Sequence, residues 1–104
     1  MRKPRILWCG ESTYLHTGYA IYGREVLNRL HATGKYEIAE FSSYGKPDAP
    51  EISSIPWQYY SNMPSTDEEL QEYNSIPTNQ FGVWRFEDVC IDFKPDIVCD
   101  IRDW

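Results

Sequence analysis

A short apolar run near the start of the chain, followed at once by a glycine, most constrains the fold. The run is RILWC, Arg5 to Cys9, and it ends at Gly10. A strand with one face in solvent alternates apolar and polar residues, whereas a nearly continuous apolar run is typical of a strand buried on both faces. The chain is therefore predicted to begin with a strand of a parallel sheet.

An amphipathic helix is predicted next, from about Gly18 to Thr33. Thr17 is a candidate N-cap, and Gly34 is a candidate left-handed residue after the last turn. The apolar and small residues recur at helical spacing, at Gly23, Val26, Leu27 and Leu30.

A second strand is predicted at Tyr36–Phe41, where apolar and polar residues alternate. Strand, helix and strand of these lengths form one βαβ unit with a right-handed crossover. The fold class is therefore α/β, a Rossmann-like parallel sheet with flanking helices.

The middle of the chain, residues 44–65, is rich in proline and serine and is predicted to be a loop or an insertion within the domain. Trp57 and Tyr59 alternate within it as in a short edge strand. Two capping-box pairs, Ser65 with Glu68 and Thr66 with Glu69, then predict a short acidic helix. The acidic residues of that helix are interpreted as a solvated first turn rather than a catalytic carboxylate pair.

Regular structure resumes after Phe81. A second amphipathic helix is predicted from the spacing of Phe86, Val89, Cys90 and Phe93, and Lys94-Pro95 ends it. The segment Asp96–Ile101 is predicted to be another buried parallel strand. Residues 1–104 therefore form one domain, and because no helix follows to cover the last strand, we expect this domain to be the amino-terminal part of a larger protein.

Charge and cysteine spacing exclude several partners. The 104 residues carry a net charge of -6 and no basic block, which disfavours nucleic acid and anionic membranes. The apolar run after MRKP is too short for a signal peptide or a membrane span. Cys9, Cys90 and Cys99 lie far apart in apolar surroundings, which favours reduced thiols and a cytoplasmic location over disulfides or a metal site.

Two glycines, Gly18 and Gly23, have the spacing of a phosphate loop. Such a loop continues with a lysine and a hydroxyl residue, whereas this chain continues with Arg24 and Glu25. The dinucleotide fingerprint is also missing, because the residues directly after the first strand are GESTY. We interpret Gly23 as a close-packing position on the sheet. With both nucleotide motifs excluded, residues 10–17 are predicted to be another kind of ligand loop, at the carboxyl end of the first strand.

The segments ILWCGESTYLHTGYAIYGREVLNRL, KYEIAEF and FKPDIVCDIRDW together resemble the amino-terminal domain of GT-B glycosyltransferases, particularly family 4-like enzymes of phage and marine metagenomic type. The resemblance implies a two-domain enzyme that transfers a sugar from a nucleotide-sugar donor, usually without a bound metal. The donor would be held mainly by a carboxyl-terminal domain absent from this chain. A carbohydrate or other hydroxyl acceptor would be held mainly by this domain, which would bind no cofactor itself.

Carried over by position, the resemblance implies that nine residues face the cleft between the two domains. Many relatives have a Gly-Gly pair before the first helix and a histidine after the later strand, where this chain has Thr17-Gly18 and the run DIRD, so no catalytic residue is assigned. The nine candidate substrate-binding residues are Gly10, Glu11, Ser12, His16, Thr17, Gly18, Asp100, Arg102 and Asp103.

Each candidate side chain also has a structural interpretation. His16 and Glu11 are either hydroxyl-binding groups or exposed loop residues, and Arg102 either lines the cleft or neutralises its acidic neighbours. Tyr14 and Tyr19 flank the loop and are the aromatic residues most suited to a sugar, while the other aromatics are expected in packing.

Two functions from different classes remain open at this point. The first is an acceptor-side glycosyltransferase domain, which alone should turn over no nucleotide sugar. The second is a non-catalytic, flavodoxin-like binding or interaction module. In either case the unfinished sheet makes self-association through its exposed edge an expectation.

Overall fold

The computed structural model describes residues 3–45, 49–77, 79, 82 and 84–101. In chain order, the elements are β1 (Arg5–Glu11), α1 (Gly18–Ala32), β2 (Glu37–Ser43), the 3₁₀ helix η1 (Pro50–Ser54), β3 (Gln58–Ser61), α2 (Asp67–Ser75), α3 (Phe86–Phe93) and β4 (Ile97–Asp100).

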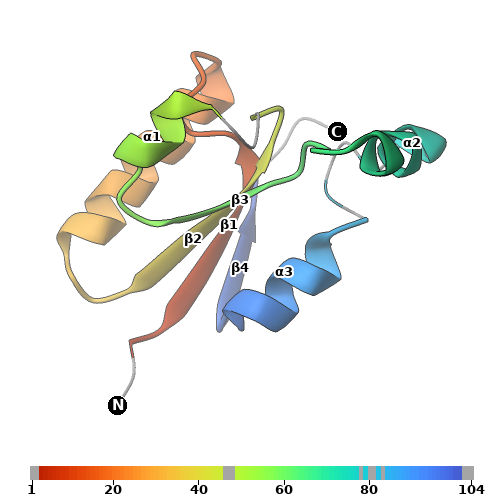
Figure 1. Cartoon of the computed structure of the whole chain (residues 1–104). Helices are drawn as coiled ribbons and strands as arrows, with labels where there is room; N and C mark the ends of the chain where they lie inside the picture. Colours follow the sequence, from red (N-terminus) through yellow and green to blue (C-terminus); the bar gives the residue numbers. More distant parts are fainter. Residues whose placement is uncertain (1–2, 46–48, 78, 80–81, 83, 102–104) are drawn as a thin grey trace.

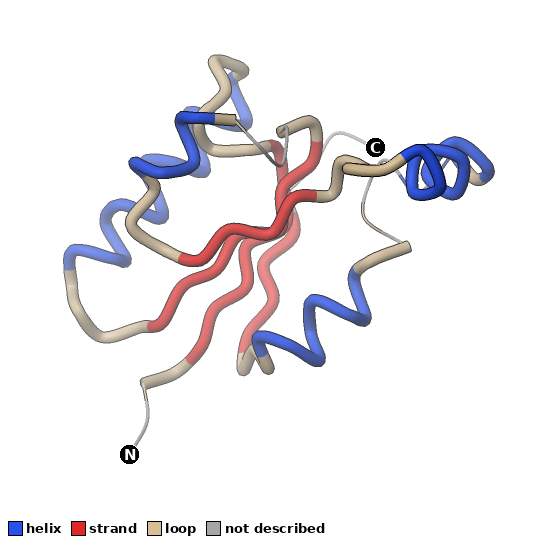
Figure 2. Tube along the Cα trace, viewed as in Figure 1, coloured by secondary structure: helices blue, strands red, loops and turns tan. Residues whose placement is uncertain are grey.

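The four strands form one sheet in which every pair is parallel, in the order β3-β2-β1-β4. These are the first four positions of the doubly wound order 3-2-1-4-5-6. A flavodoxin-like order would instead place the third strand beside the first. Helix α1 and η1 cover one face of the sheet and α3 covers the other (Figures 1 and 2). The predicted Rossmann-like α/β fold is confirmed.

The apolar run of β1 is buried from both sides. Trp8 packs with Leu27 of α1, whereas Leu7 and Cys9 pack with Phe93 of α3. Because successive side chains of a strand point to opposite faces, a strand between two helical layers needs apolar residues at every position. This packing explains why RILWC lacks alternation.

The prediction that β1 ends at Gly10 was wrong. Gly10 and Glu11 continue the ladder, opposite Ser42 and Ser43 of β2. A Cβ at Gly10 would lie 2.9 Å from the Ile101 carbonyl oxygen, so the glycine lets the chain after β4 approach β1 closely. The ligand loop is therefore residues 12–17 rather than 10–17.

Helix α1 forms as its sequence predicts. The Thr17 hydroxyl accepts from the Ala20 amide at 3.1 Å, and Gly34 takes the left-handed conformation with φ of 67°. Gly23 lies against the indole of Trp8, where an added Cβ would be 3.0 Å from Nε1. The close approach of helix and sheet explains why this position is glycine.

The start of α2 differs from expectation in one detail, whereas α3 ends at Lys94-Pro95 as expected. At the start of α2, Thr66 is the N-cap, and Ser65 bonds to Glu69 rather than to Glu68. At the end of α3, Lys94 adopts the left-handed conformation, with φ of 57°, ahead of Pro95.

The segment Asp96–Ile101 contains the expected parallel strand, but the prediction that it is buried was wrong. Ile97 is 50% exposed and Val98 is 43% exposed. Strand β4 lies at the edge of the sheet with β1 as its one neighbouring strand. An edge strand has neighbouring side chains along one side, so its apolar side chains are left partly exposed.

Within the described part of the chain, no helix has both the length and the apolar character needed to cross a membrane.

We predict that alanine has opposite effects on the free energy of unfolding at two glycines of α1, lowering it at Gly23 and raising it at Gly18. Gly23→Ala should lower the free energy of unfolding by about 1 kcal/mol, because overpacking against Trp8 costs about 1–3 kcal/mol and the helix-propensity gain is about 1 kcal/mol. Gly18→Ala is the matched control, since a Cβ there meets nothing within 4 Å. Denaturant unfolding measures both variants, and a more stable Gly23→Ala protein would contradict the packing argument.

Candidate functional site

The carboxyl ends of β1 and β4 meet at the point where the strand order reverses. Strand β1 leads into α1, which covers β1 and β2, whereas β4 lies on the other side of β1. In open α/β sheets, ligands bind in the crevice outside this reversal. The residues that follow β1, together with the end of β4, are therefore the first candidates for a site.

Among the candidate residues that the structure describes, Glu11 and Thr17 are in direct contact. The Thr17 hydroxyl donates to a carboxylate oxygen of Glu11 at 2.6 Å. Since Thr17 also caps α1, the Glu11 carboxylate lies at the positive end of the helix dipole, where it is stabilised. The same carboxylate makes this helix end unfavourable for a phosphate.

The remaining candidates have different surroundings. His16 and Gly18 are exposed, and Asp100 lies at the exposed end of β4 opposite Cys9. Arg102 and Asp103 lie outside the described residues.

Gly18 and Ile101 line a shallow crevice of about 550 Å³ together with two tyrosines of α1. Tyr19 is 43% exposed and Tyr22 is 54% exposed, and the Tyr22 ring lies 6.4 Å from the Trp8 ring, centre to centre. The crevice thus combines exposed aromatic rings with the Glu11–Thr17 pair at the start of the same helix. Tyr19 was among the aromatics expected to contact a ligand, whereas Tyr22 was expected in packing.

Ser12, another candidate, is fully buried and is not available to a ligand. Its hydroxyl is hydrogen-bonded to the Tyr59 hydroxyl of β3 at 2.8 Å. Burial raises the pKa of Tyr59 to about 12, against the lowering effect of its hydrogen bond to Ser12. Ser12 therefore ties the loop to the sheet.

A buried carboxylate that the sequence analysis did not single out holds the same loop. Glu40 of β2 is fully buried and accepts hydrogen bonds from the Thr13 amide at 3.1 Å, the Thr13 hydroxyl at 2.6 Å and the Trp57 indole at 2.9 Å, and from the Ser42 hydroxyl. Each oxygen receives two donors. Glu40 positions the β1–α1 loop without contacting the crevice residues named above.

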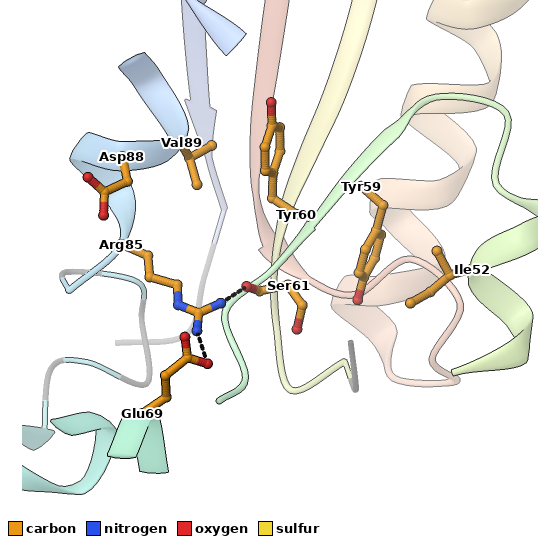
Figure 3. Close-up of a pocket in the computed structure, with 8 residues that line it drawn as sticks. All are labelled: Ile52, Tyr59, Tyr60, Ser61, Glu69, Arg85, Asp88 and Val89. Carbon is orange, nitrogen blue, oxygen red and sulfur yellow. Dashed lines mark hydrogen bonds and ion pairs between the residues drawn. The ribbon is translucent and has the colours of Figure 1, made fainter. Parts of the chain in front are cut away.

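A second hollow of about 540 Å³ lies beside the edge strand β3 (Figure 3). Arg85, the N-cap of α3, lies at its centre, donating to the Ser61 carbonyl at 3.1 Å and pairing with Glu69 of α2 at 2.7 Å. The guanidinium also lies 4.2 Å from the centre of the Trp84 ring. Arg85 was also missed by sequence reasoning, because no local pattern predicts its partners.

Several polar groups around Arg85 are bonded to one another. Hydrogen bonds from Ser65, with a smaller contribution from Arg85, lower the pKa of Glu69. Burial raises the pKa of Tyr60, as does its hydrogen bond to Asp92. An arginine that covers a carbonyl at a sheet edge protects that edge from pairing with another chain. We therefore interpret this hollow as the junction that joins α2 and α3 to β3.

Among the described residues, no group of three or more histidine, cysteine, aspartate or glutamate side chains has a geometry that could hold a metal ion.

Comparisons with models of protein families, with curated proteins and with solved structures give no match for this chain.

We predict that Glu40→Gln lowers the free energy of unfolding by about 2–4 kcal/mol, because an amide must turn its N–H groups towards buried donors. Glu37→Gln in the same strand is the matched control, since its exposed ion pair with Arg5 contributes at most about 1 kcal/mol. Denaturant unfolding gives the two values. Equal values for the two variants would contradict the role of Glu40.

We also predict a loss of stability at alkaline pH that depends on Tyr59. Its pKa is about 12 in the folded chain and near 10 in the unfolded chain, so its contribution is fully present below pH 10 and is lost as the pH rises towards 12. Unfolding measured across this range should show a shallower decline for Tyr59→Phe, with Tyr22→Phe as the exposed control. Equal slopes for wild type and Tyr59→Phe would contradict this assignment.

Proposed function

We propose that this chain is the acceptor-side domain of a GT-B glycosyltransferase, which transfers a sugar from a nucleotide-sugar donor to a hydroxyl acceptor. The observation that carries the proposal is the crevice at the reversal of strand order, lined by Tyr19, Tyr22 and Ile101 beside the Glu11–Thr17 pair. The resemblance of both ends of the chain to such enzymes supplies the reaction.

The chemistry of the crevice favours a sugar acceptor over a phosphate group. Exposed tyrosine rings offer an apolar face to the C–H side of a sugar ring and a hydroxyl to its rim. The Glu11 carboxylate can accept hydrogen bonds from sugar hydroxyls, but it repels a phosphate from the start of α1. We therefore assign the diphosphate of the donor to a second, carboxyl-terminal domain.

In this mechanism the chain binds and orients the acceptor. Transfer requires stabilisation of an oxocarbenium-like centre and of the departing phosphate charge, and donors from two domains supply that stabilisation. This chain forms one wall of the cleft and holds the nucleophilic hydroxyl of the acceptor in position, which lowers the activation barrier through proximity and orientation. The chain alone should therefore bind saccharides without releasing a nucleoside diphosphate.

The test measures binding to the chain by ligand-observed NMR, with a panel of neutral oligosaccharides and with UDP-glucose. We expect at least one oligosaccharide to bind. The double variant Tyr19→Ala, Tyr22→Ala should weaken that binding about tenfold, because it removes two aromatic contacts worth about 0.5–1.5 kcal/mol each. Tyr44→Ala is the matched control, because Tyr44 has the same 43% exposure as Tyr19 but does not line the crevice.

Two results would overturn the proposal. One is release of UDP from UDP-glucose by the chain alone, and the other is saccharide binding that is absent or unaffected by loss of both tyrosines. Sequencing the complete gene provides an independent check. A second Rossmann-like half with basic residues supports the enzyme, whereas a stop codon soon after Trp104 supports a binding module.

A further inference from the structure

We propose that the chain has a second saccharide site, which binds one neutral sugar ring in a polar pocket between α1 and η1. The pocket has a volume of about 280 Å³, below the range typical of drug-sized ligands and suited to a single ring. Tyr14, Arg24, Asn28, Glu51, Ile55 and Trp57 are among its lining residues, and we call it the α1–η1 pocket.

The α1–η1 pocket is separate from the crevice of the proposed acceptor site. Leu27 lies on the face of α1 that covers the sheet. At 3.6 residues per turn, Tyr19 and Tyr22 project from one flank of that face, towards β4, while Arg24 and Asn28 project from the other, towards η1. The crevice and the α1–η1 pocket thus lie on opposite sides of α1, and the second saccharide site does not depend on the proposed transfer reaction.

Arg24 has unused hydrogen-bonding capacity in this pocket. Its guanidinium carries five N–H donors. Within the described residues it makes one hydrogen bond, a long contact of 3.3 Å from Nη1 to the Thr13 carbonyl. Asn28 lies one helical turn further along on the same flank and adds an amide donor and acceptor. Two adjacent polar side chains of α1 therefore face a cavity that can hold hydroxyl groups.

A carboxylate on the opposite wall supplies the acceptor that a sugar also needs. Glu51 lies in η1 and lines the pocket across from α1. Each sugar hydroxyl can donate one hydrogen bond and accept others. Neighbouring hydroxyls of one ring can therefore accept from Arg24 on one wall and donate to Glu51 on the other.

The charges around the pocket select a neutral ring over an anion. Arg24 is positive, but Glu51 is negative and lines the same pocket. Glu40 lies directly behind the wall, because its carboxylate is bonded to Thr13 and Trp57, which both line the pocket. One positive and two negative groups repel a phosphate or a uronate.

The aromatic wall of the pocket is held in a fixed position. The indole N–H of Trp57 donates to Glu40 at 2.9 Å, and the ring lies edge-on to His31 of α1 with a centroid distance of 5.9 Å. Tyr14 closes the same pocket from the loop, with its ring 6.5 Å from that of Tyr59. Fixed aromatic surfaces contact a ligand at low cost in conformational entropy.

The test uses the full chain and ligand-observed NMR with methyl glucoside, methyl galactoside and methyl mannoside, and with glucuronate as the anionic analogue. We expect one neutral glycoside to bind more tightly than glucuronate. Both Arg24→Gln and Glu51→Gln should weaken its binding, each about tenfold, through loss of a charge-assisted hydrogen bond. The matched controls are Arg29→Gln and Glu25→Gln, which change exposed residues of α1 outside the pocket and should alter affinity less than about twofold.

Glu51→Gln keeps the proposal falsifiable if Arg24→Gln fails to fold, because Glu51 is exposed on a short surface helix. An anion site predicts tighter glucuronate binding in Glu51→Gln, and that result would overturn the proposal. So would glucuronate binding more tightly than every neutral glycoside, or no glycoside binding at millimolar concentration. Loss of binding in Tyr19→Ala, Tyr22→Ala but not in Arg24→Gln would overturn it too, because that result assigns the sugar to the crevice alone.

Discussion

The buried carboxylate of Glu40 joins three parts of the chain that are distant in sequence: the β1–α1 loop through Thr13, the end of β2 through Ser42, and the segment before β3 through Trp57. Removing a carboxylate from water costs several kcal/mol, and hydrogen bonds to a charged group return about 1.5–3 kcal/mol each. Four donors are enough to offset that cost, and each donor that is lost leaves part of the cost uncompensated. The loop, the strand end and the indole must therefore all be in place together, which fixes the carboxyl edge of the sheet as one unit.

This constraint determines what the edge can offer a ligand. Thr13 and Ser12 are committed to Glu40 and Tyr59, so the start of the β1–α1 loop is structural. Groups that face outward come from the end of the loop and from α1, where Thr17 and Glu11 are already paired. The crevice and the α1–η1 pocket differ in chemistry because different side chains project from the two flanks of α1. Because Gly23 brings that helix close to Trp8, both flanks lie near the sheet.

Local patterns predicted most of the fold and pointed to the carboxyl end of β1 as the candidate site, but they did not predict the partners of individual residues. The apolar run of β1, the Thr17 cap of α1 and the Phe93 stripe of α3 each depend on neighbours within a few residues, and the structure confirms all three. Glu40 was read as one polar position in an alternating strand. Its burial involves Trp57, seventeen residues later, which follows a 3₁₀ helix that no periodicity indicated. The exposure of Ile97 likewise follows from the position of β4 at the sheet edge, which its own sequence does not specify.

The glycine spacing of α1 shows how one sequence pattern can serve two structural purposes. In a phosphate loop, glycines expose backbone amides to an anion, and the helix that follows contributes its positive end. Here Gly18 is the first residue of the helix, Gly23 faces the sheet, and the Glu11 carboxylate bonds to the residue that caps the helix. A negative group at that position disfavours a bound phosphate and can accept hydrogen bonds from hydroxyl groups. The same edge of a Rossmann-like sheet that holds nucleotides in other proteins is therefore, in this chain, the edge at which we propose that a sugar binds.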